Sequence, residues 1–81
     1  MIVEDEGKAA AALIEFIAKG IVSKPDDIAV TPCEGGSLLE LETDDSDRGR
    51  VIGRQGRIAK SMRAILASSN TGADCRLEIV D

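Results

Sequence analysis

Residues 48–63 of the chain read RGRVIGRQGRIAKSMR. This stretch, here called the basic window, carries six of the chain's ten basic residues and no Asp or Glu. The rest of the chain holds four basic and fifteen acidic side chains, so a local charge of +6 stands within a net charge of −5. A positive island on an acidic chain predicts a binding site for an anion, which the net charge alone would hide.

Two glycines, Gly53 and Gly56, enclose Arg54 and Gln55 at the centre of the basic window. Glycine tolerates positive φ and lets main-chain N–H groups approach a ligand closely. A helix that begins at Arg57 would direct its unpaired N–H groups and its positive dipole end into this loop, which is how phosphate is bound. The plainer alternative is a helix–glycine–helix connection with solvated arginines, because a lone Gly-x-x-Gly is a weak signal. The surrounding basic side chains and helices favour the phosphate site.

A first helix is predicted from Glu4 to Val22, where apolar side chains recur at helical spacing and gather on one side. We expect this side, which includes the chain's single aromatic residue, to face the core. The apolar set is Ala9, Ala10, Leu13, Ile14, Phe16, Ile17 and Ile21. Pro25 prevents the helix from continuing much further.

Two alternating runs predict a β-hairpin. Residues 27–33 and 38–43 each alternate apolar with polar side chains, and a Glu-Gly-Gly-Ser turn, residues 34–37, separates them. One face of the hairpin should therefore be buried and the other wet. Pro32 indicates that the first strand ends there or runs along a sheet edge.

A polar run, residues 43–47, supplies N-caps for a short helix that ends at Ile52. Its acids either confine the positive patch to one surface or are simply solvated. A longer helix is predicted over residues 57–69, apolar on one arc and basic on the next, and a last strand over residues 74–80. The resulting order predicts an α+β fold with helices covering one face of a sheet.

The composition limits the other classes of function. Eighty-one residues predict one domain over residues 1–81, and two distant cysteines without any His give no zinc-site spacing. No apolar run reaches the roughly 20 residues of a membrane span, and the acidic start lacks the form of a signal peptide, so we expect a cytoplasmic protein without membrane contact. The sequence has no nucleophile–base pair and no Walker pattern, so we expect no catalysis, no cofactor and no metal.

Residues 51–58, Val-Ile-Gly-Arg-Gln-Gly-Arg-Ile, resemble the signature of the KH domain, an RNA-binding module. In that module a Gly-x-x-Gly loop between two helices clamps the backbone of about four nucleotides. The element order resembles the type II, prokaryotic arrangement αββααβ, and nearly the whole chain resembles the small stand-alone KH proteins of bacteria (the KhpA or YlqC family). The resemblance implies a three-stranded sheet with three helices on one face. It also implies RNA binding without catalysis, and a homodimer or a heterodimer with a second KH-domain protein.

Carried over by position, the resemblance makes Gly53 and Gly56 the loop glycines and places Ile52 and Ile58 along the groove for the bases. The neighbouring basic side chains complete the set. The expected RNA-binding residues are Gly53, Arg54, Gln55, Gly56, Arg57, Lys60, Arg50, Ile52 and Ile58. The acidic net charge departs from what is usual for an RNA-binding protein.

The sequence supports two hypotheses of function. In the first, the loop grips single-stranded RNA by its backbone, in an RNA chaperone or post-transcriptional regulator. With Phe16 expected in the core, no aromatic side chain is left for base stacking. We expect Gly53→Asp combined with Gly56→Asp to abolish RNA binding while the fold persists. In the second, the chain is a protein-interaction module that dimerises through its apolar first helix or its exposed strand edges.

Overall fold

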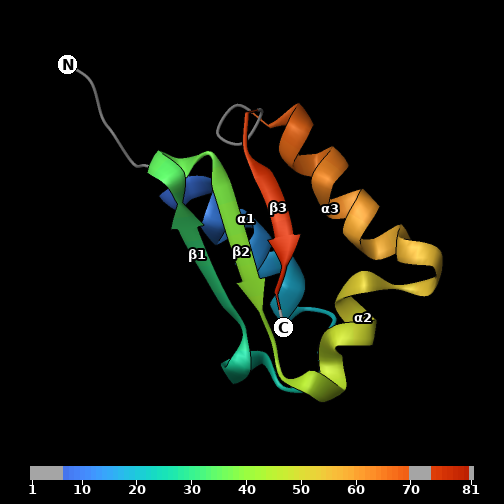
Figure 1. The fold of residues 1–81 in the computed structure, drawn as a ribbon. Coiled ribbons are helices and arrows are strands. Elements are labelled where there is room, and N and C mark those ends of the chain that lie inside the picture. Colours follow the sequence, from blue (N-terminus) through green and yellow to red (C-terminus); the bar gives the residue numbers. More distant parts are fainter. Residues whose placement is uncertain (1–6, 70–73, 81) are drawn as a thin grey trace.

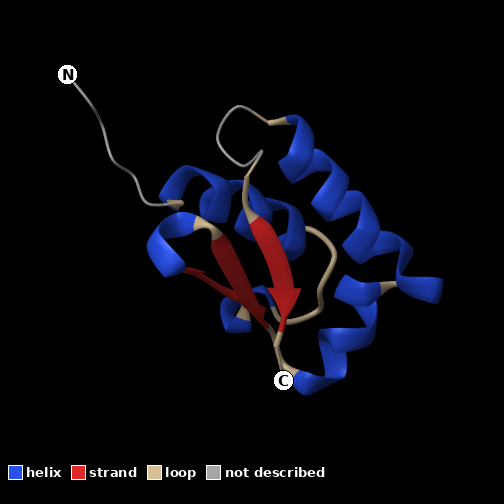
Figure 2. Cartoon of the chain, turned by 45° about the horizontal axis from the view of Figure 1, so that its top comes forward, coloured by secondary structure: helices blue, strands red, loops and turns tan. Residues whose placement is uncertain are grey.

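The computed structural model describes residues 7–69 and 74–80, and it places helices on one face of a sheet (Figures 1 and 2). Within these residues, the α-helices are Lys8–Lys19 (α1), Arg48–Ile52 (α2) and Arg57–Ser68 (α3). The strands are Ala29–Cys33 (β1), Leu38–Glu42 (β2) and Arg76–Ile79 (β3). The predicted α+β class, element order and three-stranded sheet are confirmed. The helix start predicted at Glu4 lies outside the described residues.

The strands lie in the order β1-β2-β3. β1 and β2 pair antiparallel, with Val30 opposite Leu41, as the two alternating runs predict. β1 therefore lies at an edge of the sheet, where Pro32 is tolerated because its missing N–H faces no neighbouring strand. After α2 and α3 the chain returns so that β3 pairs parallel to β2, with Leu77 beside Leu39.

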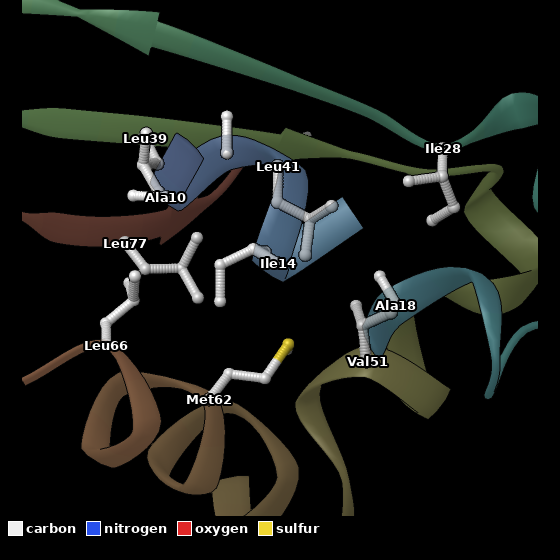
Figure 3. Packing of buried hydrophobic residues seen from close by; sticks show 11 residues of the cluster. Ala10, Ile14, Ala18, Ile28, Leu39, Leu41, Val51, Met62, Leu66 and Leu77 are labelled. Atoms are coloured by element: carbon white, nitrogen blue, oxygen red, sulfur yellow. The ribbon is translucent and has the colours of Figure 1, made fainter. Parts of the chain in front are cut away.

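An aliphatic core fills the space between the sheet and the helices (Figure 3). Its largest side chains come from α1, β2 and α3, and each is at most 1% exposed: Ile14, Leu39, Leu41, Met62 and Leu66. Burying a side chain of this size contributes about 1.5–3 kcal/mol. The short helix α2 adds Val51, which is also fully buried, so the segment leading into the glycine loop is anchored in the same core.

The predicted position of Phe16 is wrong. Its side chain is 80% exposed, whereas Ala10, Ala11 and Ala18 are buried around Ile14. At about 100° per residue, those alanines lie within about 60° of Ile14, and Phe16 lies nearly opposite. Their small side chains allow α1 to lie close to its neighbours, and a phenyl ring would not fit at such an approach.

Cys33 lies at the end of β1 and Cys75 just before β3, and neither forms a disulfide within residues 7–69 and 74–80. Within residues 7–69 and 74–80, no helix has the length and apolar character needed to cross a membrane.

Truncating Ile14 and Phe16, two residues of the same helix, should have very different effects. We expect Ile14→Ala to lower the free energy of unfolding by about 2–5 kcal/mol, because it leaves a cavity in the core. We expect Phe16→Ala to change it by less than about 0.5 kcal/mol in dilute solution, because the ring is already exposed. Urea unfolding followed by circular dichroism measures both. Similar losses in the two variants would contradict this orientation of α1.

Candidate nucleic-acid interface

The glycine loop joins α2 to α3 at the side of the molecule away from β1 (Figure 1). Gly53 and Gly56 both have positive φ, +79° and +73°, but for different reasons. A Cβ on Gly53 would lie 2.3 Å from Cγ1 and 2.8 Å from the main-chain N of Ile58, so no side chain fits there. A Cβ on Gly56 would meet nothing within 4 Å, so only its left-handed backbone favours glycine.

Gln55, between the glycines, also has a positive φ of +57°. A left-handed conformation is uncommon for a residue with a side chain, and such strain concentrates at binding sites. The Gln55 side chain is exposed, and its Oε1 accepts a hydrogen bond of 3.3 Å from Arg57. The loop therefore presents Arg54 and Gln55 to solvent.

The main-chain cradle expected at this loop is only partly available. The N–H of Gly53 donates to Gly49 O at 2.8 Å, and that of Gly56 donates to Gly53 O at 3.0 Å. The N–H of Arg57 donates to Arg54 O. Three amides of the predicted cradle are thus already bonded to carbonyl groups of α2 and the loop, and an anion here would be held chiefly by side chains.

Basic side chains surround the loop and follow one edge of α3. Arg54, Arg57, Lys60 and Arg63 are exposed, and no carboxylate of the described residues lies within ion-pair distance of them. We call these four the free cations. By contrast, Arg48 pairs with Asp45 at 2.7 Å.

The position of Arg57 runs against the usual electrostatics of a helix. It is the first residue of α3, whose first turn contains no acidic residue and whose N-cap, Gly56, offers no side-chain hydrogen bond. The positive end of a helix dipole is stabilised by acidic side chains and destabilised by basic ones. A bound anion would relieve this arrangement, and this is a physical reason to place a ligand there.

A hollow of about 360 Å³ lies between α3 and β3, lined by Arg63 and residues 75–78. The N–H groups of Arg76 and Val80 donate to β2, at Ser37 O and Leu41 O, so the main chain of Leu77 faces away from β2. Arg63 Nε donates to Leu77 O at 3.1 Å. Arg63 therefore belongs both to the free cations and to the lining of the hollow, so the two features adjoin along α3.

Comparison with known proteins identifies the family of the chain. Residues 11–79 match the family model of the KhpA/KhpB KH domain. The chain belongs to this KH-domain family. The RNA-binding protein KhpA of Borreliella burgdorferi is 42% identical over 73 residues, which cover 85% of this chain and 89% of that protein. The proteins of the same name from Treponema pallidum and Halalkalibacterium halodurans are 41% and 40% identical over 73 residues, covering 85% of this chain and 91% and 96% of their own lengths. No solved structure gives a significant match.

The family resemblance drawn from residues 51–58 is thereby confirmed. Of the predicted site residues in this KH domain, the loop, Arg57, Lys60 and the two isoleucines all lie at the α2–α3 junction, in the last residue of α2, the loop and the first turn of α3. Ile52 is 36% exposed and Ile58 is half-buried against Gly53. Arg50 is the exception, because its Nε lies 3.5 Å from the buried carboxylate of Asp47 and it is partly engaged there.

The wall of the hollow was missed by the sequence analysis. Cys75, Arg76 and Glu78 follow the glycine loop by about twenty residues, and nothing in their pattern links them to it. Only the parallel crossover of the KH domain carries β3 to the side of α3 (Figure 1). Arg63 was counted among the basic residues, but its bond to the β3 main chain has no sequence signal.

Nothing in the sequence indicated the structural role of Asp47. Of the predicted caps, Asp44 accepts a hydrogen bond of 2.9 Å from Ser46 N, whereas Asp47 is fully buried and reaches back to the α1–β1 connection. It accepts from Ser23 N at 3.0 Å, from Ser23 Oγ at 2.8 Å and from Lys24 N at 3.0 Å. The bond from Ser23 N holds the pKa of this carboxyl below its ordinary value, assisted by the other donors and by Arg50, although burial acts in the opposite direction.

Replacing Asp47 with Asn, which keeps the size of the side chain but removes its charge, should destabilise this KH domain at neutral pH. Because the pKa of Asp47 is depressed in the folded state, its ionised form stabilises the fold above the unfolded-state pKa of about 3.9. That contribution is lost as the pH falls through the lower folded-state pKa. We therefore expect the difference in urea midpoint between the wild type and Asp47→Asn to be widest near neutrality and to close in acid.

The matched control is Asp45→Asn, two residues away, because the Asp45 side chain is 90% exposed. Its ion pair with Arg48 lies at the surface, and such pairs contribute little. We expect a small effect at every pH for this control. A midpoint difference for Asp47→Asn that does not change with pH would contradict the proposed stabilising role of its charge.

Proposed function

We propose that this KH domain binds single-stranded RNA by its sugar–phosphate backbone, at the glycine loop and along the basic edge of α3. The observation that carries the proposal is the set of free cations, Arg54, Arg57, Lys60 and Arg63, on an otherwise acidic chain. Most contacts between proteins and nucleic-acid backbones come from such side chains. The names of the relatives, RNA-binding protein KhpA, support the choice of RNA as the anion.

In this proposal different residues of the interface contact different parts of the RNA. Arg54, Arg57 and Lys60 contact phosphates, with Arg50 and Gln55 beside them. Gly53 and Gly56 keep side chains out of the path of the backbone. Ile52 and Ile58 offer apolar contact to bases that lie toward the hollow between α3 and β3. Binding of this kind is led by the backbone, and it suits an RNA chaperone or a post-transcriptional regulator that acts in the cytoplasm, without catalysis and without a cofactor.

The test of the loop uses Gly56, because a substituent on Gly53 would collide with Ile58 and disturb the start of α3. The earlier expectation that the fold survives Gly53→Asp is therefore replaced. We expect Gly56→Asp to weaken binding of a labelled single-stranded RNA at least about tenfold, because it places a negative charge where a phosphate would lie. Gly56→Ala is the matched control, since it imposes the same left-handed strain without the charge. Fluorescence anisotropy measures the binding, and circular dichroism verifies the fold. Equal affinities for folded Gly56→Asp and Gly56→Ala would remove the loop from the mechanism.

The salt dependence of the binding constant should report how many phosphates the protein neutralises. If Arg54, Arg57 and Lys60 each neutralise one phosphate, the slope of log K against log salt should be near −2, from about −0.7 per phosphate on a single strand. Arg54→Gln should make this slope shallower by about 0.7 and should weaken binding of different sequences equally. Anisotropy titrations over a range of salt concentrations measure the slope. An unchanged slope in Arg54→Gln would show that this side chain touches no phosphate.

We propose, as a second and compatible function, that the chain self-associates or pairs with another KH-domain protein. Large apolar side chains are exposed on two helices outside the loop, Phe16 on α1 at 80% and Ile65 on α3 at 41%. Exposed aromatic side chains are typical anchors of protein interfaces. Sedimentation of the protein with and without RNA tests this function.

A further inference from the structure

We infer that α1 carries a second RNA contact, at which one base stacks on the ring of Phe16. The inference rests on the RNA binding proposed above and extends the path of the strand from the glycine loop over the helices. The contact consists of Phe16, Lys8 and Lys19 with the small residue Ala12 between them, all exposed. At about 100° per residue these four lie within an arc of about 80°, on the side of α1 away from Ile14 and the core.

The surface formed by the helices is predominantly basic. Two basic residues lie in α1, two in α2 and three in α3, and within these three helices Glu15 is the single acidic residue. The acidic side chains of the sheet lie on its other side. Glu40 and Glu78 alternate with core residues of β2 and β3, and they therefore face away from the helices. A polyanion that leaves the glycine loop thus meets attractive charge on the helices and repulsive charge on the sheet.

Lys8 and Lys19 extend the positive surface to α1. Lys8 is exposed, and no carboxylate of residues 7–69 and 74–80 lies within ion-pair distance of it. Lys19 pairs with Glu15 at 2.7 Å, but the two side chains are 43% and 41% exposed. Surface pairs of this kind contribute little, so a phosphate can replace Glu15 as the partner of Lys19. Along the helix axis Lys8 lies about 12 Å before Phe16 and Lys19 about 4.5 Å after it, so phosphates on both sides of a stacked base have a cation.

Phe16 has the exposure that base stacking requires. Its ring, the only aromatic ring in the chain, is 80% exposed. A hollow of about 260 Å³ adjoins it, lined by Ala12, Glu15, Phe16 and Lys19. That volume exceeds the roughly 150 Å³ of a cavity that holds benzene, and the small side chain of Ala12 leaves the space open, so a flat base fits against the ring. The expectation that no aromatic side chain is left for stacking depended on a buried Phe16, and the exposure of the ring corrects it.

The surface around Phe16 suits a base better than it suits a protein partner. The other exposed apolar side chains on this side of α1 are those of Ala9 and Ala12, so a single ring provides most of the apolar area. A stable protein contact buries roughly 1,200 Å² or more, whereas one exposed ring is enough to stack one base. Ile65 of α3 remains exposed for the self-association proposed above.

Two labelled RNAs and two substitutions of Phe16 test the contact by fluorescence anisotropy. A KH loop clamps about four nucleotides, so tetrauridylate fills the loop, and an oligouridylate several times longer also reaches α1. We expect Phe16→Leu, which is apolar but has no aromatic face, to weaken binding of the long strand at least about fivefold and to leave tetrauridylate unaffected. Phe16→Tyr, which keeps an aromatic face, should bind both RNAs as the wild type does. Equal affinities of the wild type and Phe16→Leu for the long strand would overturn the inference.

A tryptophan reports the stacking directly, because the chain contains no Trp and no Tyr. The fluorescence of Phe16→Trp should be quenched as the long oligouridylate binds, since a base then lies against the indole ring. Thr31→Trp is the matched control, because Thr31 is also exposed but lies on β1 opposite Glu40, on the acidic side of the sheet. Its fluorescence should not change. RNA binding without quenching in Phe16→Trp, or equal quenching in the two variants, would contradict the contact.

Removing the charge of Lys8 tests whether the strand follows α1. Lys8→Gln should make the slope of log K against log salt shallower by about 0.7 for the long strand, the value of one phosphate contact, and should leave the slope for tetrauridylate unchanged. The matched control is Lys24→Gln, because Lys24 is exposed but lies outside the helices, 3.5 Å from Asp44. This control should leave both slopes unchanged. Equal slopes of Lys8→Gln and Lys24→Gln on the long strand would show that Lys8 touches no phosphate, against the inference.

Sedimentation and the loop variants separate this inference from the two functions proposed above. Phe16→Leu should sediment as the wild type does. Loss of self-association in Phe16→Leu with unchanged RNA affinity would make the ring a protein contact and overturn the inference. Gly56→Asp should bind both RNAs more weakly than Gly56→Ala does. If those two variants bound both RNAs equally while Phe16→Leu still weakened the long strand, the loop would be refuted and the contact on α1 would be supported.

Discussion

The first turn of α3 packs so closely on the main chain of Gly53 that a Cβ there would lie 2.3 Å from Cγ1 of Ile58. This approach fixes how α2 turns into α3. Val51, just before the loop, and Met62, in the second turn of α3, can then share one core, and both are at most 1% exposed. Arg54, between them in sequence, is left in solvent. The site thus exists because one residue without a side chain lets two helices meet with almost no linker between them.

Asp47 fixes the other end of α2. Its carboxylate lies at the helix start but is bonded to Ser23 and Lys24, more than twenty residues earlier in the chain, so the α1–β1 connection and α2 cannot move apart without unpairing a buried charge. Unpaired buried charges are strongly destabilising. Because Arg50 also lies near this carboxylate, the anchor of the fold and the edge of the binding surface are in contact. α2 is a helix of only five residues, and these tertiary contacts, rather than its own hydrogen bonds, hold it in place.

Much of this architecture could be predicted from local patterns, and most of the failures concern contacts between residues far apart in sequence. Alternation located β1 and β2, and the Gly-x-x-Gly spacing located the α2–α3 junction, because both are set by nearby residues. Phe16 was placed in the core because it is apolar, although at about 100° per residue it lies nearly opposite Ile14. The parallel pairing of β3, the hollow that it lines with Arg63, and the partners of Asp47 depend on residues far apart in sequence, for which a single sequence carries no signal.

Two charge arrangements in the structure lower the stability of the fold. Arg57 begins α3 at the positive end of its dipole, and Glu40 on β2 lies beside Glu78 on β3, a pairing of like charges. A fold selected only for stability would avoid both, and such departures are expected at functional sites. For the RNA binding proposed above, both would act on a polyanion in the same direction: the acidic strands would repel it, and the free cations would attract it to the loop. In the proposed function, an acidic chain would then bind a nucleic acid in one orientation, with weak non-specific affinity elsewhere on its surface, and the net charge of −5 would contribute to the selectivity of the proposed site.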